Sequence, residues 1–106
     1  MPATIMVLYE NVQGARFDLD YYMKTHMPLV GEKFAPFGLK AWRVVQSAGA
    51  LDGSPAAFRV AALLEFDTVD QFRRAAAAEG VVVFGDVPNF TDIKPVQMLS
   101  ELVGAS

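Results

Sequence analysis

The fold of this chain is decided by the stretch FDLDYYMKTHMPLV, residues 17–30. Asp18 predicts the start of a helix, because its carboxylate can accept hydrogen bonds from the free backbone N–H groups of a first turn. Phe17 and Tyr22 have the spacing of a hydrophobic staple across that start. The apolar residues that follow recur at intervals of three and four, so we expect them to share one inward face of the helix with His26.

The same stretch contains the only histidine of the chain, followed two residues later by a proline. Pro28 cannot donate a hydrogen bond to the carbonyl of Lys24, which predicts a break in the helix around His26. Imidazole is the only side chain whose ordinary pKa, about 6.5, lies near neutral pH. We therefore expect His26 to act as a general acid or base in a pocket between helix and sheet. The alternative is a partly buried histidine that satisfies carbonyls freed by the proline.

The rest of the chain predicts four strands and a second helix. Thr68 and Gln71 form a capping box at the start of that helix, and Gly80 is a suitable residue to end it. Pro95 lies early in the last strand, which favours an edge position. The predicted strands are residues 4–9, 39–47, 58–66 and 93–103. The resulting order, β-α-β-β-α-β, predicts a single ferredoxin-like α+β domain over residues 1–106, with a four-stranded antiparallel sheet.

One face of the predicted sheet lacks a cover. The strand over residues 58–66 has one fully apolar face and one mixed face with Leu63 at its centre, and residues 4–9 are apolar on both faces. Two helices can cover only one face of such a sheet. The hydrophobic fraction of 53% and the mean hydropathy of +0.27 also exceed what a small core needs, which favours a partner subunit and an internal pocket.

Composition narrows the class of protein. The 106 residues include no cysteine, which excludes disulfides, thiolate metal sites and a cysteine nucleophile. The net charge is −3 and the basic residues are scattered, so we expect no nucleic-acid partner. We see neither a signal peptide nor a membrane span, and expect a soluble cytoplasmic protein.

Two stretches resemble a known family. Residues 17–28 read F-D-x-x-Y-Y-x-x-x-H-x-P, which is similar to the signature of the EthD family, named for ethyl tert-butyl ether degradation. Residues 86–92, DVPNFTD, resemble the same family near its C-terminus. Gly38-Leu39 and Asp52-Gly53 also lie where that family has them, whereas Glu10 stands where a proline would be expected after Tyr9. The resemblance implies a dimeric α+β barrel, in which a second copy covers the open sheet face. We therefore expect a homodimer.

Several side chains are candidate partners of His26. Tyr22 lies one turn before it and could orient the imidazole or donate to a substrate oxygen, or it could serve only in the staple. Asn89, Thr91 and Asp92 form a polar cluster in which a carboxylate could hold the imidazole in one tautomer, or in which the side chains could bond only their own backbone. Asp92 is the carboxylate we expect in that role. Asp86 is a weaker candidate in an ordinary loop position, and Tyr21 is expected at the surface or in an interface.

Other side chains are candidates for lining a pocket. Trp42 could wall an aromatic pocket or fill the core, and Met23, with Met6 and Met27, would suit an irregular apolar cavity or plain packing. A single histidine without cysteine makes a zinc or copper site improbable, so we expect no metal and no cofactor. Some relatives in the wider barrel superfamily bind haem, which would make His26 an axial ligand.

Two classes of function remain at this stage. The first is a cofactor-free lyase, cyclase, isomerase or oxygenase that acts on a small apolar or aromatic molecule, with His26 transferring a proton. The second is a non-catalytic binding or auxiliary protein of an oxidative degradation pathway. Both require an apolar pocket. Only the first requires a hydrogen-bond partner for His26.

Overall fold

The computed structural model describes residues 1–106 and confirms the ferredoxin-like α+β fold. Its four strands form one antiparallel sheet in the order β2-β3-β1-β4. The strands are β1 (Ala3–Glu10), β2 (Ala41–Gln46), β3 (Phe58–Phe66) and β4 (Val96–Glu101). β4 is an edge strand and begins directly after Pro95, as the proline predicts.

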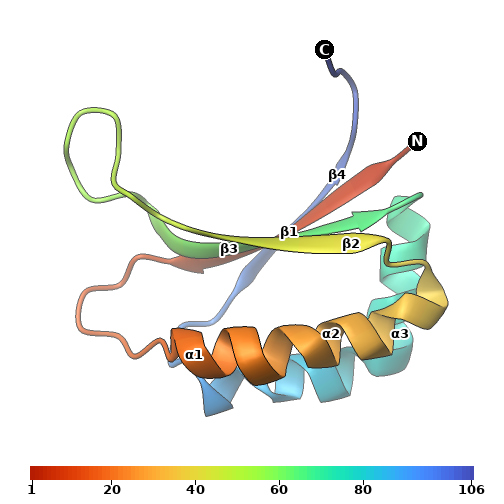
Figure 1. Ribbon diagram of the computed structural model, residues 1–106, viewed down its shortest axis with the longest axis horizontal. Coiled ribbons are helices and arrows are strands. Elements are labelled where there is room, and N and C mark those ends of the chain that lie inside the picture. The colour runs from red at the N-terminus through yellow and green to blue at the C-terminus, as the bar shows by residue number, and fades with distance from the viewer.

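All the helices lie on one face of this sheet (Figure 1). The main ones are α1 (Leu19–Tyr21), the π-helical η1 (Tyr22–His26), α2 (Met27–Phe34) and α3 (Val69–Gly85). Two short 3₁₀ segments, η2 (Ala35–Phe37) and η3 (Val87–Asn89), follow α2 and α3. None of these helices combines the length and the apolar character that crossing a membrane would need.

The first helix starts as predicted but is not broken. The Asp18 carboxylate accepts from the backbone N–H of Tyr21 at 3.0 Å, and the rings of Phe17 and Tyr22 pack with centroids 5.2 Å apart. Before Pro28 the helix widens into a π turn, in which the N–H of Met27 donates to the carbonyl of Tyr22. A register of five residues shifts the hydrogen-bond ladder past the proline, so η1 replaces the predicted break. Such π segments occur frequently at functional sites.

The second long helix extends further than its sequence predicts. The capping box of Thr68 and Gln71 is present, but α3 continues past Gly80 to Gly85. Val83 and Gly80 are buried, so packing against the sheet outweighs the weak helix propensity of this β-branched run.

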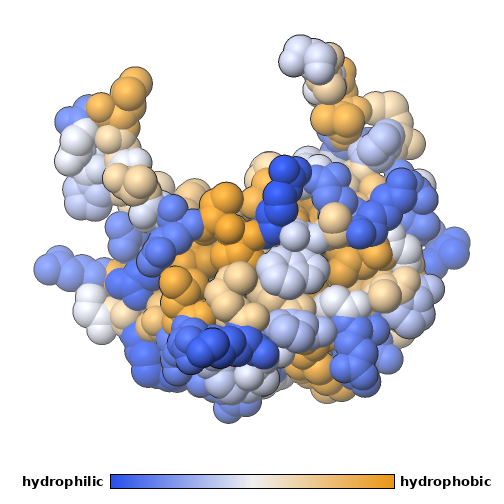
Figure 2. Space-filling view, in the orientation of Figure 1, coloured by the Kyte–Doolittle hydropathy of each residue, from blue (hydrophilic) through white to orange (hydrophobic).

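The core lies between the sheet and the helices, as the strand pattern predicts. On β3 the buried residues alternate with half-buried ones, and Leu63 belongs to the half-buried set on the open face. The register places Met6 and Met98 beside Leu63 on that open face. The loop between β2 and β3 and the C-terminal tail both project on this side of the sheet (Figure 1). Figure 2 shows hydrophobic surface in the hollow between these two projections.

Candidate functional site

His26 ends the π-helical segment and points inward, with only 4% of its surface exposed. The ring of Tyr22 stacks on the imidazole at 5.4 Å between centroids and an interplanar angle of 17°. Phe90 packs on it at 4.7 Å. Because Phe90 comes from the loop after α3, the imidazole is held between two segments that are far apart in the sequence.

Asp86 is the hub of the polar contacts around His26. It caps the C-terminal end of α3. One carboxylate oxygen lies 2.9 Å from Nδ1 of His26. The other accepts from the hydroxyl of Tyr21 at 2.7 Å and from the side-chain amide of Asn89 at 2.9 Å. These donors offset the unfavourable position of an acid at a helix C-terminus, where the dipole is negative.

The electrostatics of this cluster favour a neutral imidazole beside an ionised acid. Burial lowers the pKa of His26 below its usual value of 6.5, and the hydrogen bond and charge of Asp86 offset this only in part. Burial would raise the pKa of the Asp86 carboxyl, but the hydrogen bonds from Tyr21, Asn89 and His26 outweigh it and bring the pKa below its usual value. The hydrogen bond that Tyr21 donates to Asp86 raises the pKa of its phenol.

This pairing fixes which nitrogen of His26 is free. A carboxylate only accepts, so the proton of the neutral ring lies on Nδ1 and the lone pair lies on Nε2. Nε2 makes no hydrogen bond within the chain, and no fully enclosed side-chain nitrogen or oxygen lacks a partner. Water can therefore reach Nε2. The arrangement is that of a general base held in one tautomer by an acid.

His26 lines a small chamber between the helices and the sheet. The volume of this chamber is about 20 Å³, enough for about one water molecule. Its walls are mainly apolar, but Tyr9 and Tyr22 also line it. The two tyrosine hydroxyls neighbour each other, and burial raises the pKa of both. Both phenols therefore keep their protons at neutral pH.

A second, larger hollow lies beside the first, between the end of α3, the loop after η3 and β4. Its volume is about 540 Å³, and it is open to solvent. Val87 and Ile93 contribute apolar walls, and Thr91 and Lys94 contribute polar ones. Its size is in the range of small-molecule sites.

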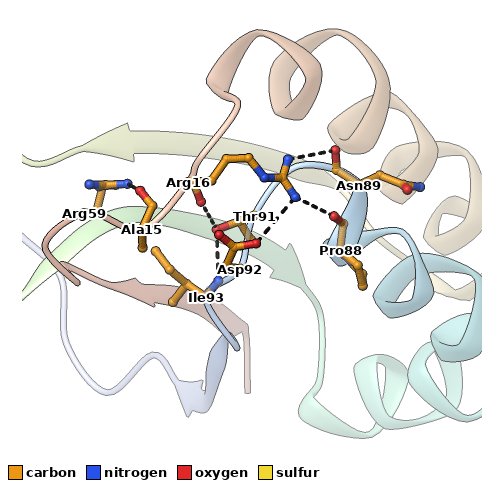
Figure 3. Close-up of polar contacts among 8 residues, drawn as sticks. All are labelled: Ala15, Arg16, Arg59, Pro88, Asn89, Thr91, Asp92 and Ile93. Carbon is orange, nitrogen blue, oxygen red and sulfur yellow. Dashed lines mark hydrogen bonds and ion pairs between the residues drawn. The ribbon is translucent and has the colours of Figure 1, made fainter.

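The loop that carries Asn89 and Phe90 is fixed by Arg16 (Figure 3). The guanidinium donates to the carbonyl of Pro88 at 2.7 Å and to that of Asn89 at 3.3 Å. In return, the hydroxyl of Thr91 donates to the carbonyl of Arg16 at 2.6 Å. Arg16 thereby holds in place the loop whose Phe90 packs on the imidazole.

The structure assembles some of the predicted site residues and separates others. Tyr22 contacts His26, and Asn89 contacts it indirectly through Asp86. Asp92 does not contact His26. Its side chain is 68% exposed and lies 3.7 Å from the guanidinium of Arg16. The expectation that Asp92 partners the imidazole is therefore wrong, because the chain places Asp86 there instead.

Two predicted pocket residues lie outside the chamber, whereas Asp86, the weaker candidate, and Tyr21, expected at the surface, both belong to the site. Trp42 is half-buried on the helix side of β2, with Nε1 3.5 Å from where a Cβ of Gly31 would lie, and Met23 is exposed. Neither lines the chamber. The sequence favours a loop at Asp86, because Gly80 predicts an earlier end of the second helix. An acid at the C-terminal end of a helix is unfavourable by itself, and that signal marks Asp86 once α3 is known to reach residue 85.

The chain holds no group of three or more histidine, cysteine, aspartate or glutamate side chains with the spacing of metal ligands. A chamber of about 20 Å³ also has no room for a haem beside His26. The residues around the imidazole thus do not fit the haem-ligand alternative.

Comparison with solved structures identifies the family. An EthD-like protein from Ralstonia eutropha JMP134 superimposes with a TM-score of 0.89 and is 33% identical, over 99% of this chain and 95% of that one. The chain belongs to the EthD family. No protein-family model and no curated protein matches it.

More distant structures share the fold of this EthD-family protein. SnoaB, a cofactor-independent oxygenase from Streptomyces nogalater, is 11% identical with a TM-score of 0.70, over 98% of this chain and 95% of that one. A dimeric ferredoxin-like protein of unknown function from Thermobifida fusca YX is 16% identical with a TM-score of 0.62, over 96% of this chain and 92% of that one.

Proposed function

We propose that this EthD-family protein is a homodimer that binds a small apolar or aromatic molecule beside His26, and that Nε2 of His26 removes a proton from it without a cofactor. The observation that carries this proposal is the pairing of His26 with Asp86 at 2.9 Å. Burial keeps the imidazole neutral, and the pairing leaves the lone pair on Nε2, the atom that is free of protein partners. A lyase, cyclase, isomerase or cofactor-free oxygenase needs such a base.

The distribution of charge between Asp86 and His26 supports the role of His26 as a base. An ionised Asp86 stabilises the imidazolium that forms when Nε2 takes a proton, and Tyr21 and Asn89 keep that acid ionised. Tyr22 stacks on the ring and limits its rotation. SnoaB, an oxygenase that works without a cofactor, has the same fold. The fold is therefore compatible with this kind of chemistry.

A second candidate function is binding without chemistry. The observation that favours it is the tight enclosure of the imidazole by Tyr22 and Phe90 around a chamber of about 20 Å³. In this alternative His26 and Asp86 only tie the first helix to the end of α3. The protein would then carry a hydrophobic metabolite for an oxidative pathway.

The open sheet face supports the homodimer. Val96 and Met98 of β4 are 45% and 46% exposed there, and Leu63 and Met6 are half-buried beside them. An exposed apolar strip of this kind marks a protein interface. The two projecting segments that flank it present Leu51 and Val103 almost fully exposed. A structural relative from Thermobifida fusca is described as dimeric.

Proton abstraction can be measured without knowing the natural substrate. We would incubate the protein in D₂O with a panel of small aromatic ketones and follow deuterium incorporation next to the carbonyl by NMR. The wild type should accelerate exchange for at least one ketone. His26→Asn should abolish that acceleration, because its amide can still donate to Asp86 but offers no base at the position of Nε2.

Thermal melting of both proteins at one concentration gives the control. His26→Asn should melt within a few degrees of the wild type if the role is catalytic. Exchange by His26→Asn at the wild-type rate would exclude His26 as the base. A wild type that binds ketones and accelerates none would support the carrier alternative.

A further inference from the structure

The two hollows described above share a single wall residue. Phe84, near the end of α3, is the only side chain that lines both the small chamber at His26 and the open groove. It is partly buried, whereas Val83 before it is fully buried. The ring of Phe84 therefore stands between the chamber that His26 lines and the open groove.

The chamber and the groove on the two sides of Phe84 differ greatly in volume. The chamber, at about 20 Å³, is far too small for a metabolite, whereas the groove, at about 540 Å³, is large enough. A molecule in the groove would meet the ring of Phe84 before it met His26. Rotation of that one side chain would join the two spaces.

The helix leaves room on one side of this ring. Gly80 lies one turn before Phe84, and a Cβ at Gly80 would be 3.4 Å from Cδ2 and 3.7 Å from Cε2 of the ring. Apart from the adjacent residues and the backbone of α3 itself, nothing else lies within 4 Å of that position. The glycine thus leaves unfilled the space against one edge of Phe84, and a methyl group there would hold the ring where it now lies.

The groove lies on the side away from the proposed dimer interface. Gln97, which lines it, pairs with Val7 and so lies on the helix face of the sheet, whereas Val96 and Met98 point to the open face. The groove would stay accessible in the dimer. Its charges are unequal, because Asp92 lies beside Arg16, while Lys94 forms no ion pair and is exposed. An anionic group on a ligand would therefore be attracted to Lys94.

We infer that the groove and the chamber are one ligand site, and that the ring of Phe84 is the gate between its two parts. The ligand is a flat, mainly apolar molecule with a hydroxyl or carbonyl group at the end that reaches His26 and an anionic group at the end near Lys94. This inference rests on the proposed function, because it takes His26 as the end of the site.

The probe for this site is 6-hydroxy-2-naphthoate, which carries a hydroxyl and a carboxylate at opposite ends of a flat body. Binding is read from the NMR signal of the His26 ring, which is unambiguous because the chain has one histidine. Association rates are read from the fluorescence of the probe. The variants are Phe84→Ala, Gly80→Ala and Lys94→Gln, with Phe84→Leu as a second gate variant in case the alanine variant does not fold.

The probe should shift the His26 signal of the wild type. Phe84→Ala should bind it about tenfold faster, because a site that is closed most of the time loses affinity and rate in proportion to its open fraction. Gly80→Ala should bind it several-fold more slowly while melting at a higher temperature, since alanine also favours the helix. Lys94→Gln should weaken binding up to about fivefold. 2-Naphthoate, which lacks the hydroxyl, should bind more weakly than the probe.

The outcomes separate the gate from the function on which it rests. A His26 signal that shifts with equal association rates in the wild type, Phe84→Ala and Gly80→Ala would overturn the gate. Slower binding to Phe84→Ala would make Phe84 a wall rather than a gate. Equal affinity for 2-naphthoate and the probe would overturn the assignment of the hydroxyl end to His26. A His26 signal that moves in no variant, even with Phe84 removed, would instead contradict the proposed function.

Discussion

Replacing Asp86 by asparagine tests the polar cluster most fully. The carboxylate accepts from His26, Tyr21 and Asn89, and its side chain is only 12% exposed. An amide of the same shape keeps one acceptor oxygen and turns the other into a donor. If the amide oxygen faces Nδ1, the NH₂ group faces Tyr21 and Asn89, which both lose their acceptor. If the NH₂ group faces Nδ1, the imidazole must change tautomer and its proton moves to Nε2.

The cost can be worked out from these contacts. A hydrogen bond to a charged group contributes about 1.5–3 kcal/mol. Removing an acid from the C-terminal end of α3 raises the free energy of unfolding by about 0.3–1 kcal/mol, because the helix dipole is negative there. We therefore expect Asp86→Asn to lower the free energy of unfolding by about 2 kcal/mol, which in a domain of this size lowers Tm by about 10 °C. Asp92→Asn is the matched control, because Asp92 is exposed, and it should stay within about 0.5 kcal/mol of the wild type.

The dependence of stability on pH gives the same variant a second readout. His26 binds its proton less readily in the folded state, so wild-type stability should fall as pH drops below 6.5 toward the folded pKa of His26. Asp86 has a lowered folded pKa, so its contribution is fully present above pH 3.8 and is lost as pH falls through that folded pKa. Asp86→Asn should lack the second change. It should also lower the pKa of His26 further, because the charge and hydrogen bond that raise it are gone.

Urea unfolding from about pH 2 to 8 and an NMR titration of the single histidine measure both effects, at one protein concentration because a dimer's stability depends on it. An Asp86→Asn protein as stable as Asp92→Asn would refute the account of the cluster. A rise in the pKa of His26 in that variant would refute the claim that Asp86 raises this pKa.

Two further predictions concern the interface and the loop. Leu63→Lys should shift the proposed dimer toward monomer in light scattering, since it places a charge in the centre of the open apolar face, whereas Val81→Lys, at a position 90% exposed on α3, should leave the mass unchanged. A dimer that survives Leu63→Lys would place the interface elsewhere. Arg16→Gln should destabilise the protein by about 1 kcal/mol and speed amide exchange at Phe90, because two carbonyls of the loop lose a partly exposed donor. Arg74→Gln, which breaks only an exposed pair with Asp70, should change neither.

The fold could be read from the sequence because its signals are local and agree with one another. The strand over residues 58–66 alternates along its whole length, and its bounds are those of β3. Asp18 and the capping box of Thr68 mark both helix starts, and both caps are present. Each of these patterns depends on a few neighbouring residues and on the period of one element.

The details of the site could not be read in this way, because they depend on packing between distant elements. Pro28 shows that one backbone donor is missing, but it does not show whether the helix breaks or widens into a π turn. Gly80 is a normal stop signal, yet burial of Val83 carries α3 onward to Gly85. That extension decides that Asp86 rather than Asp92 faces the imidazole. A family signature places His26 on a helix, but its partner is set by where another helix ends.

The most direct test of the central claim is the tautomer of His26 in the free protein at pH 7.5. Nitrogen-15 chemical shifts of the single imidazole distinguish the neutral Nδ1–H form, the neutral Nε2–H form and the imidazolium. The pairing with Asp86 and the lowered pKa of His26 predict a neutral ring with its proton on Nδ1 and a bare Nε2. A proton on Nε2 at this pH would contradict the claim that Asp86 holds His26 ready as a base.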